Sequence, residues 1–117
     1  MSEALVVALV GWTAVLVTGG LTVLVAADPK RGLAVLTHRP ECLPQVMAVR
    51  YAGLALLAFA AAWHAQPDVL LALMLSFALI STGDTIIYAR AGHRYAPHAI
   101  AGAASLAAIV LLLTAQR

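Results

Sequence analysis

The sequence has little charge, few aromatic residues and a single cysteine. Of its 117 residues only 10% are charged and 6% are aromatic, whereas 63% are apolar. A soluble globular domain carries about 25% charged residues, so this composition excludes a water-soluble enzyme and a disordered tail. The net charge of +2 is too small for a nucleic-acid-binding protein, and no nucleic acid is expected as a partner. Because Cys42 is the only cysteine, one chain can form neither an internal disulfide nor a thiol–disulfide couple.

Long apolar runs occupy most of the chain. About 20 apolar residues cross the hydrocarbon core of a bilayer as a helix, and the first run has 24 residues without a charge. Four runs are expected to span the membrane, at residues 4–27, 46–65, 69–89 and 97–116. The sequence therefore predicts an all-α fold, with one transmembrane domain over residues 1–117 that is built as an integral membrane four-helix bundle.

The connections between these runs indicate how the chain is oriented. The loop 28–45 has an apolar centre that is far too short to span, so we expect it to lie along the bilayer surface. This loop, the turn at 90–96 and the start of the second helix hold six of the seven lysines and arginines. The positive-inside rule then places both connections in the cytoplasm and both termini outside. We expect a multi-pass protein of the plasma membrane, which is the inner membrane of a bacterium, with membrane lipid as a partner.

Polar side chains interrupt the spans near the cytoplasmic boundary. A charged residue inside a span costs about 3 kcal/mol on insertion scales, so its presence requires a reason. Asp84 lies about 9 Å inside the boundary, given the 1.5 Å rise per residue of a helix. Arg50 and His98 lie near the same boundary in the second and fourth spans, and the first span adds Thr18 and Thr22. All four helices therefore bring polar groups to one depth.

The spacing of these residues places them on shared helix faces. Ser81, Asp84 and Tyr88 are at positions i, i+3 and i+7 of the third span, and His98 and Ser105 are seven residues apart in the fourth. With these faces turned inward, the bundle holds a polar pocket that opens toward the cytoplasmic leaflet. The predicted catalytic residues are Asp84, Arg50, His98 and Tyr88. The predicted ligand-binding residues are Tyr51, Ser81, Thr22, Thr18 and Ser105.

Three interpretations of Arg50 and Asp84 stay open at this level. Arg50 can extend to the lipid headgroups and do nothing else, it can form an ion pair with Asp84 that fixes the helix register, or both can belong to a ligand or catalytic site. No metal site is expected, because His38 and Cys42 lack the paired spacing of a zinc site and Pro40 interrupts the helix that would align them. No cofactor is expected either.

The stretch 80–88 (ISTGDTIIY), the basic turn after it and the histidine-bearing fourth span resemble a family of small four-helix membrane proteins from bacteria and fungi. That family is catalogued as a domain of unknown function. The resemblance covers about residues 20–115. The matched positions are Gly83 and Asp84 in the third helix, Arg50 at the start of the second and His98 at the start of the fourth. Tyr51 stands where the family often has an acidic residue, so the resemblance implies a four-helix fold but neither a two-carboxylate mechanism nor any other reaction.

Three kinds of function fit these features. The first hypothesis is a bundle that binds a lipophilic small molecule. In a stronger form of this hypothesis the bundle also transforms the molecule by acid–base chemistry, such as epoxide opening, isomerisation or cyclisation. Asp84 would act as the acid or base, Arg50 would orient it or stabilise an oxyanion, and Tyr88 and His98 would donate hydrogen bonds. The alternative is a non-enzymatic accessory or assembly subunit. A proton-coupled transporter that uses Asp84 is the third. Small-residue helix faces favour a homo-oligomer. The residues do not decide whether the chain is an enzyme.

Overall fold

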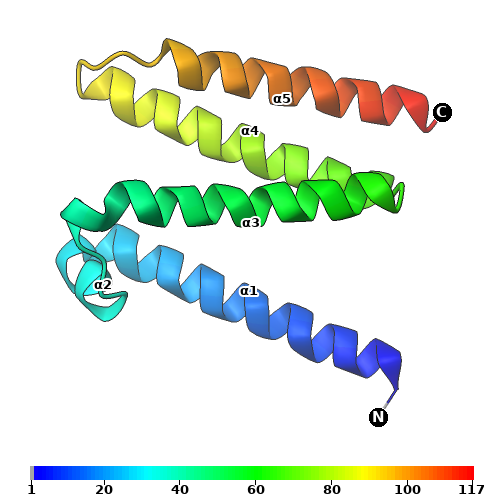
Figure 1. Cartoon of the computed structure of the whole chain (residues 1–117), viewed down its shortest axis with the longest axis horizontal. Helices are drawn as coiled ribbons and strands as arrows, with labels where there is room; N and C mark the ends of the chain where they lie inside the picture. Colours follow the sequence, from blue (N-terminus) through cyan, green and yellow to red (C-terminus); the bar gives the residue numbers. More distant parts are fainter. Residues whose placement is uncertain (1) are drawn as a thin grey trace. The chain divides into compact units, whose positions relative to one another are not determined.

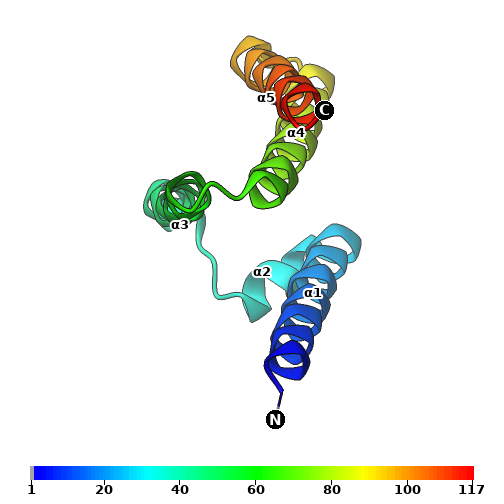
Figure 2. The ribbon, with the colours of Figure 1, turned by 90° about the vertical axis from the view of Figure 1, so that its right-hand side faces the viewer.

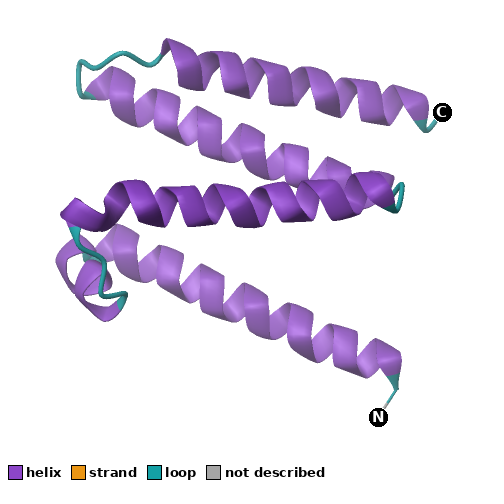
Figure 3. Ribbon diagram, viewed as in Figure 1, coloured by secondary structure: helices purple, strands orange, loops and turns teal. Residues whose placement is uncertain are grey.

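The computed structural model describes residues 2–117, with the Val7 side chain outside that description. Helices make up most of these residues, which include no strand (Figure 3). The helical elements in chain order are α1 (Glu3–Ala27), α2 (Pro29–Val35), the 3-10 turn η1 (Pro40–Cys42), α3 (Leu43–Trp63), α4 (Pro67–Arg90) and α5 (Ala96–Ala115) (Figure 1). The predicted all-α fold class is therefore confirmed.

Four of these helices are long and apolar enough to span a membrane: α1, α3 together with η1, α4 and α5. They correspond to the four predicted runs. Helix α3 begins at Leu43, three residues earlier than predicted, because Pro44 lies in its first turn, where a helix needs no N–H donor. Large apolar side chains stay exposed on them, with Leu16 at 74% and Leu79 at 76%. Such faces are costly in water but not in lipid, consistent with a multi-pass membrane protein.

The chain divides into two compact units, Met1–Val49 and Arg50–Arg117. Each unit is described below by itself. That the two join into the predicted single bundle stays a prediction.

In the first unit, α2 folds back against α1 (Figure 2). The contact is close because Gly32 has no side chain: a Cβ atom there would lie 2.8 Å from the Cα atom of Val25. Helix α2 begins after Asp28, whose carboxylate accepts a hydrogen bond from the Arg31 N–H at 3.2 Å. The predicted surface loop thus contains a short helix that packs onto the end of the first span.

In the second unit, α4 and α5 run side by side (Figures 1 and 2). Gly102 of α5 is buried, and a Cβ atom at this position would lie 3.5 Å from the Cβ atom of Ser81. Glycine at such a contact lets two helix backbones approach, as is common where helices pack inside membranes. The approach brings the polar face of α4 against the polar face of α5.

The ends of α4 and α2 share one hydrogen-bond pattern, the Schellman motif. At the end of α4, the His93 N–H donates to the Tyr88 carbonyl at 2.9 Å, and the Gly92 N–H donates to the Ala89 carbonyl at 3.1 Å. Gly92 has a φ of 73°, which glycine adopts without a steric penalty. The corresponding residue after α2 is Thr37, with a φ of 55°. The glycine therefore gives α4 an unstrained turn, while α2 ends on a strained residue.

Candidate functional site

Asp84 and His98 face each other across the contact between α4 and α5. The Oδ2 atom of Asp84 lies 3.5 Å from the Nδ1 atom of His98, and the two side chains are 38% and 34% exposed. Asp84 is two turns before the end of α4, and His98 is the third residue of α5, so the short turn between the helices brings them together. An ionisable group within a membrane span needs a polar partner. In this structure the partner of the aspartate is an imidazole.

Tyr88 holds the imidazole of His98 from a second direction. The two rings are stacked, with centroids 4.8 Å apart and planes 10° from parallel. Tyr88 is one helical turn after Asp84, so both contacts to His98 come from one face of α4. His93, placed by the Schellman motif, adds an edge contact to the Tyr88 ring at 6.3 Å. The carboxylate and the phenol ring together define the position and the plane of the imidazole.

A cavity of about 260 Å³ lies beside this pair, and α3, α4 and α5 of the second unit all contribute to its wall. We call it the Asp84 cavity. Its polar lining is Tyr51, Ser81, Asp84, His98 and Ser105, and its apolar lining is Leu54, Phe77, Ile80 and Ala101. A mostly apolar wall with a few convergent polar groups is typical of small-molecule sites.

Two polar groups of the Asp84 cavity offer a ligand only acceptors, the Asp84 carboxylate and the Ser105 hydroxyl, whereas Tyr51, Ser81 and His98 can also donate. Ser105 is buried, and its hydroxyl donates to the carbonyl of Ala101 at 2.9 Å. Because this bond uses the only proton of the hydroxyl, the oxygen can only accept from a ligand. Within residues 2–117, neither the Ser81 hydroxyl nor the Asp84 carboxylate takes part in a hydrogen bond with another residue. Both are available to a bound molecule.

Most of the predicted site residues come together here. The structure places Asp84, His98 and Tyr88 in contact, and it places Tyr51, Ser81 and Ser105 in the wall of the Asp84 cavity. Arg50 precedes Tyr51 on α3, is exposed, and is not among the described residues that line this cavity.

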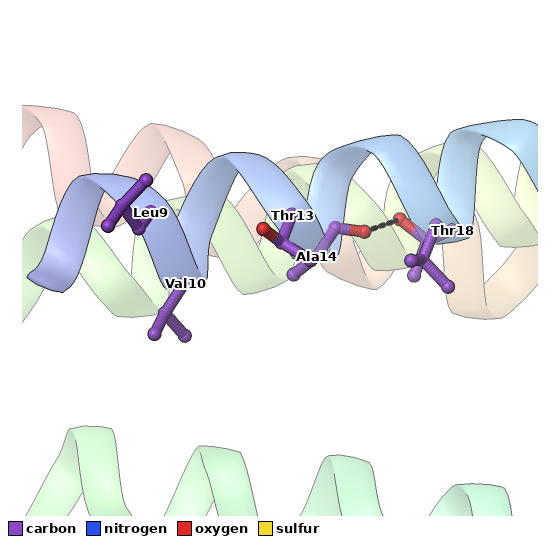
Figure 4. A pocket seen from close by; sticks show the side chains of 6 residues that line it. Leu9, Val10, Thr13, Ala14 and Thr18 are labelled. Atoms are coloured by element: carbon purple, nitrogen blue, oxygen red, sulfur yellow. Dashed lines mark hydrogen bonds between the residues drawn. The ribbon is translucent and has the colours of Figure 1, made fainter.

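The two predicted threonines lie in the other unit. Thr18 donates to the Ala14 carbonyl at 2.7 Å (Figure 4), and Thr22 donates to the Thr18 carbonyl at 2.8 Å. Thr18 also lines a groove of about 570 Å³ whose wall comes from α1 alone. That groove is larger than the Asp84 cavity, but its polar groups are hydroxyls and none of them ionises. We therefore take the Asp84 cavity as the candidate site.

Two features of the site were missed in the sequence. The sequence does not predict the pairing of Asp84 with His98; an ion pair between Asp84 and Arg50 is one of the three interpretations that it leaves open. The apolar wall was not predicted either, although helical spacing contains the signal: Ile80 is four residues before Asp84, and Ala101 is three residues after His98. Extending each polar stripe by one turn would have found these residues.

The described residues contain no group of three or more histidine, cysteine, aspartate or glutamate side chains that could hold a metal ion. Comparisons of the chain with protein-family models, with curated proteins and with solved structures found no match.

Proposed function

We propose that the Asp84 cavity binds a lipophilic small molecule that enters from the cytoplasmic leaflet, and that Asp84 and His98 form an acid–base centre for it. One observation carries this proposal: an ionisable pair lies in the wall of a cavity whose other walls are largely apolar. Lipophilic molecules concentrate in the bilayer, and a pocket formed between membrane helices is open to them. An ionisable residue within a span is by default a functional candidate.

The pair has the parts that proton transfer needs. An imidazole can take up a proton at one ring nitrogen while the other is held by a carboxylate. Since Nδ1 of His98 faces Asp84, Nε2 is the atom left for a substrate. Isomerisation of a double bond then needs no further reagent, because the base removes a proton from one substrate carbon and returns it to another. Epoxide opening and cyclisation use the same pair, which delivers a proton to the leaving oxygen and takes one from the attacking hydroxyl.

The pocket is tested by native mass spectrometry of the full chain in mild detergent. Wild type is compared with Asp84→Asn and with Asp68→Asn, a matched control at the exposed start of α4. We expect a co-purified lipophilic species on wild type and on the control, but not on Asp84→Asn. Empty chains that are identical in all three samples would favour an accessory or assembly subunit instead. The same spectra report whether the chain forms the proposed homo-oligomer.

The role of Arg50 stays part of the proposal. Arg50 immediately precedes Tyr51, which lines the Asp84 cavity, and we propose that its guanidinium orients Asp84 or stabilises an oxyanion of the bound molecule. Arg50→Ala is expected to weaken ligand retention, although less than Asp84→Asn does. If the Arg50→Ala variant retains the ligand as wild type does, Arg50 only contacts the lipid headgroups.

We also propose the predicted orientation, with the loop around η1 in the cytoplasm and both termini outside the plasma membrane. Support comes from the basic residues of that loop, and the test uses the native Cys42, which is exposed and is the only cysteine. A membrane-impermeant maleimide should leave Cys42 unlabelled in intact cells and label it after the membrane is permeabilised. Labelling of Cys42 in intact cells would indicate the opposite orientation.

The resemblance to the four-helix family of unknown function likewise stays a proposal, based on Gly83, Asp84, Arg50 and His98.

A further inference from the structure

We infer that the ligand of the Asp84 cavity is a lipophilic amine, bound through a positively charged N–H group. This inference rests on the proposed function, since it names the chemical class of the molecule that the cavity takes. The juxtaposition of an aspartate, an acceptor-only serine and aromatic rings in one small cavity carries it.

The hydrogen-bonding groups of the cavity call for a donor. A carboxylate accepts hydrogen bonds and donates none; Oδ2 of Asp84 faces the imidazole of His98, and within residues 2–117 no hydrogen bond is donated to Oδ1. The Ser105 hydroxyl donates its proton to the carbonyl of Ala101, so its oxygen can only accept a hydrogen bond from a ligand. A ligand that offers only acceptors would leave Oδ1 of Asp84 and the oxygen of Ser105 without a donor, at a cost in affinity. A ligand with N–H groups satisfies both.

The charge and the walls of the cavity favour a cation. Among the described residues that line the cavity, Asp84 is the acidic one, and the aromatic residues Tyr51 and Phe77 line the same space. Aromatic ring faces attract ammonium groups, most strongly where water is excluded. Two cationic groups act against a positively charged ligand: the imidazole of His98 when protonated, and the guanidinium of Arg50. Arg50 is exposed and outside the cavity wall, whereas the Asp84 carboxylate lies in it. A carboxylate ligand is therefore the competitor that the experiment must exclude.

The volume limits the size of the amine. Cavities that hold drug-sized molecules measure about 300–1,000 Å³, and the Asp84 cavity measures about 260 Å³. The body of the ligand is therefore small, comparable with a bicyclic aromatic ring.

Three probes with one body and different heads test this inference: 2-naphthylmethylamine, 2-naphthylmethanol and 2-naphthoate. Dissociation constants are measured by native mass spectrometry on the full chain in one detergent, so that partition of the naphthalene body into micelles cancels between variants. We expect wild type to bind the amine at least tenfold more tightly than the alcohol or the acid. Asp84→Asn should weaken amine binding about tenfold, the effect of losing one charge-assisted hydrogen bond. Asp68→Asn should bind all three probes as wild type does.

A second pair of variants keeps the test decisive if Asp84→Asn does not fold. Ser105→Ala removes one acceptor from the cavity wall, and Ser76→Ala is its control, because Ser76 is exposed and donates in the same way to the Ala72 carbonyl at 2.9 Å. Ser105→Ala should weaken amine binding about fivefold, and Ser76→Ala should leave it unchanged.

The outcomes separate this inference from the proposed function. Tighter binding of the acid or the alcohol, still lost in Asp84→Asn or Ser105→Ala, would overturn the amine and leave the binding pocket standing. Binding that no cavity variant changes, or no binding of any probe, would overturn both.

Discussion

In the α1–α2 pair the closest contact occurs where a side chain is missing, at Gly32 against Val25. In the α4–α5 pair Gly102 meets α4 at ordinary van der Waals distance, and polar side chains join the helices, with Asp84 beside His98. Hydroxyl groups in both pairs bond mostly to their own helix, as Thr18 does on α1 and Ser105 does on α5, while Ser81 on α4 lines the Asp84 cavity.

This difference shows which polar residues in a membrane span indicate a site. A threonine hydroxyl reaches the carbonyl four residues earlier on its own helix, so it needs nothing from a neighbour. An aspartate or a histidine in a helix interior does not satisfy its polar groups in that way and needs a partner on another element. Asp84 and His98 accordingly meet across two helices, whereas Thr18 and Thr22, which we predicted to bind the ligand, donate to carbonyls of their own helix.

The largest expected effect comes from filling the space at Gly32. A leucine there collides with the backbone at Val25, so Gly32→Leu should destabilise the packing of α2 by about 1–3 kcal/mol. Hydrogen exchange of the α2 amides measures this loss as faster exchange. The control is Gly11→Leu on α1, where nothing lies within 4 Å. Equal protection of α2 in both variants would show that the contact is not shape-dependent.

The second prediction concerns the polar pair. A double-mutant cycle of Asp84→Asn and His98→Gln should give a coupling free energy of about 0.5–1 kcal/mol, because both side chains are more than a third exposed and are partly screened. Denaturant titration of the full chain in mixed micelles measures it. Asp68 in the first turn of α4 and His93 in the turn after this helix provide the control cycle, in which the two changes should add. Additivity at Asp84 and His98 would mean that the two groups do not interact.

The turns that end α2 and α4 provide a third test of the difference between the α1–α2 pair and the α4–α5 pair. Thr37 and Gly92 occupy equivalent positive-φ positions after α2 and α4. Thr37→Gly should stabilise the first unit by about 0.5–1 kcal/mol by relieving strain, and Gly92→Ala should destabilise the second by a similar amount. Thermal unfolding of each variant measures the sign, and opposite signs are expected. Two changes of the same sign would contradict the proposed equivalence of the turns.

The smallest effect is expected on α1. Thr18→Val and Thr22→Val keep the shape of the side chain and remove hydroxyls that bond only to their own helix, so the free energy of unfolding should change by less than about 0.5 kcal/mol. Retention of the ligand should also be unchanged in both variants. Loss of the ligand in either variant would show that the threonines belong to the binding site, as the sequence predicted.

The spans could be predicted because their signal is local. A membrane helix needs about 20 apolar residues in sequence, and the helix starts fell within three residues of the predicted ones because prolines at 44, 67 and 97 lie in first turns. The short helix α2 was not predicted as a helix, since seven residues with Gly32 among them have little helix preference of their own. Helix α2 is stabilised by its packing against α1, and the sequence of the loop gives no information about that packing.

The four apolar helices and the polar stripe on each follow from the sequence alone, because a period of 3.6 residues decides which side chains share a face. It placed Ser81, Asp84 and Tyr88 together before any neighbour was known. What that stripe faces depends on tertiary packing. The rotation of α4 against α5, with Gly102 in van der Waals contact distance of Ser81, gives the aspartate an imidazole as its partner. Helix spacing carries no information about the rotation of a neighbouring helix, which packing alone determines.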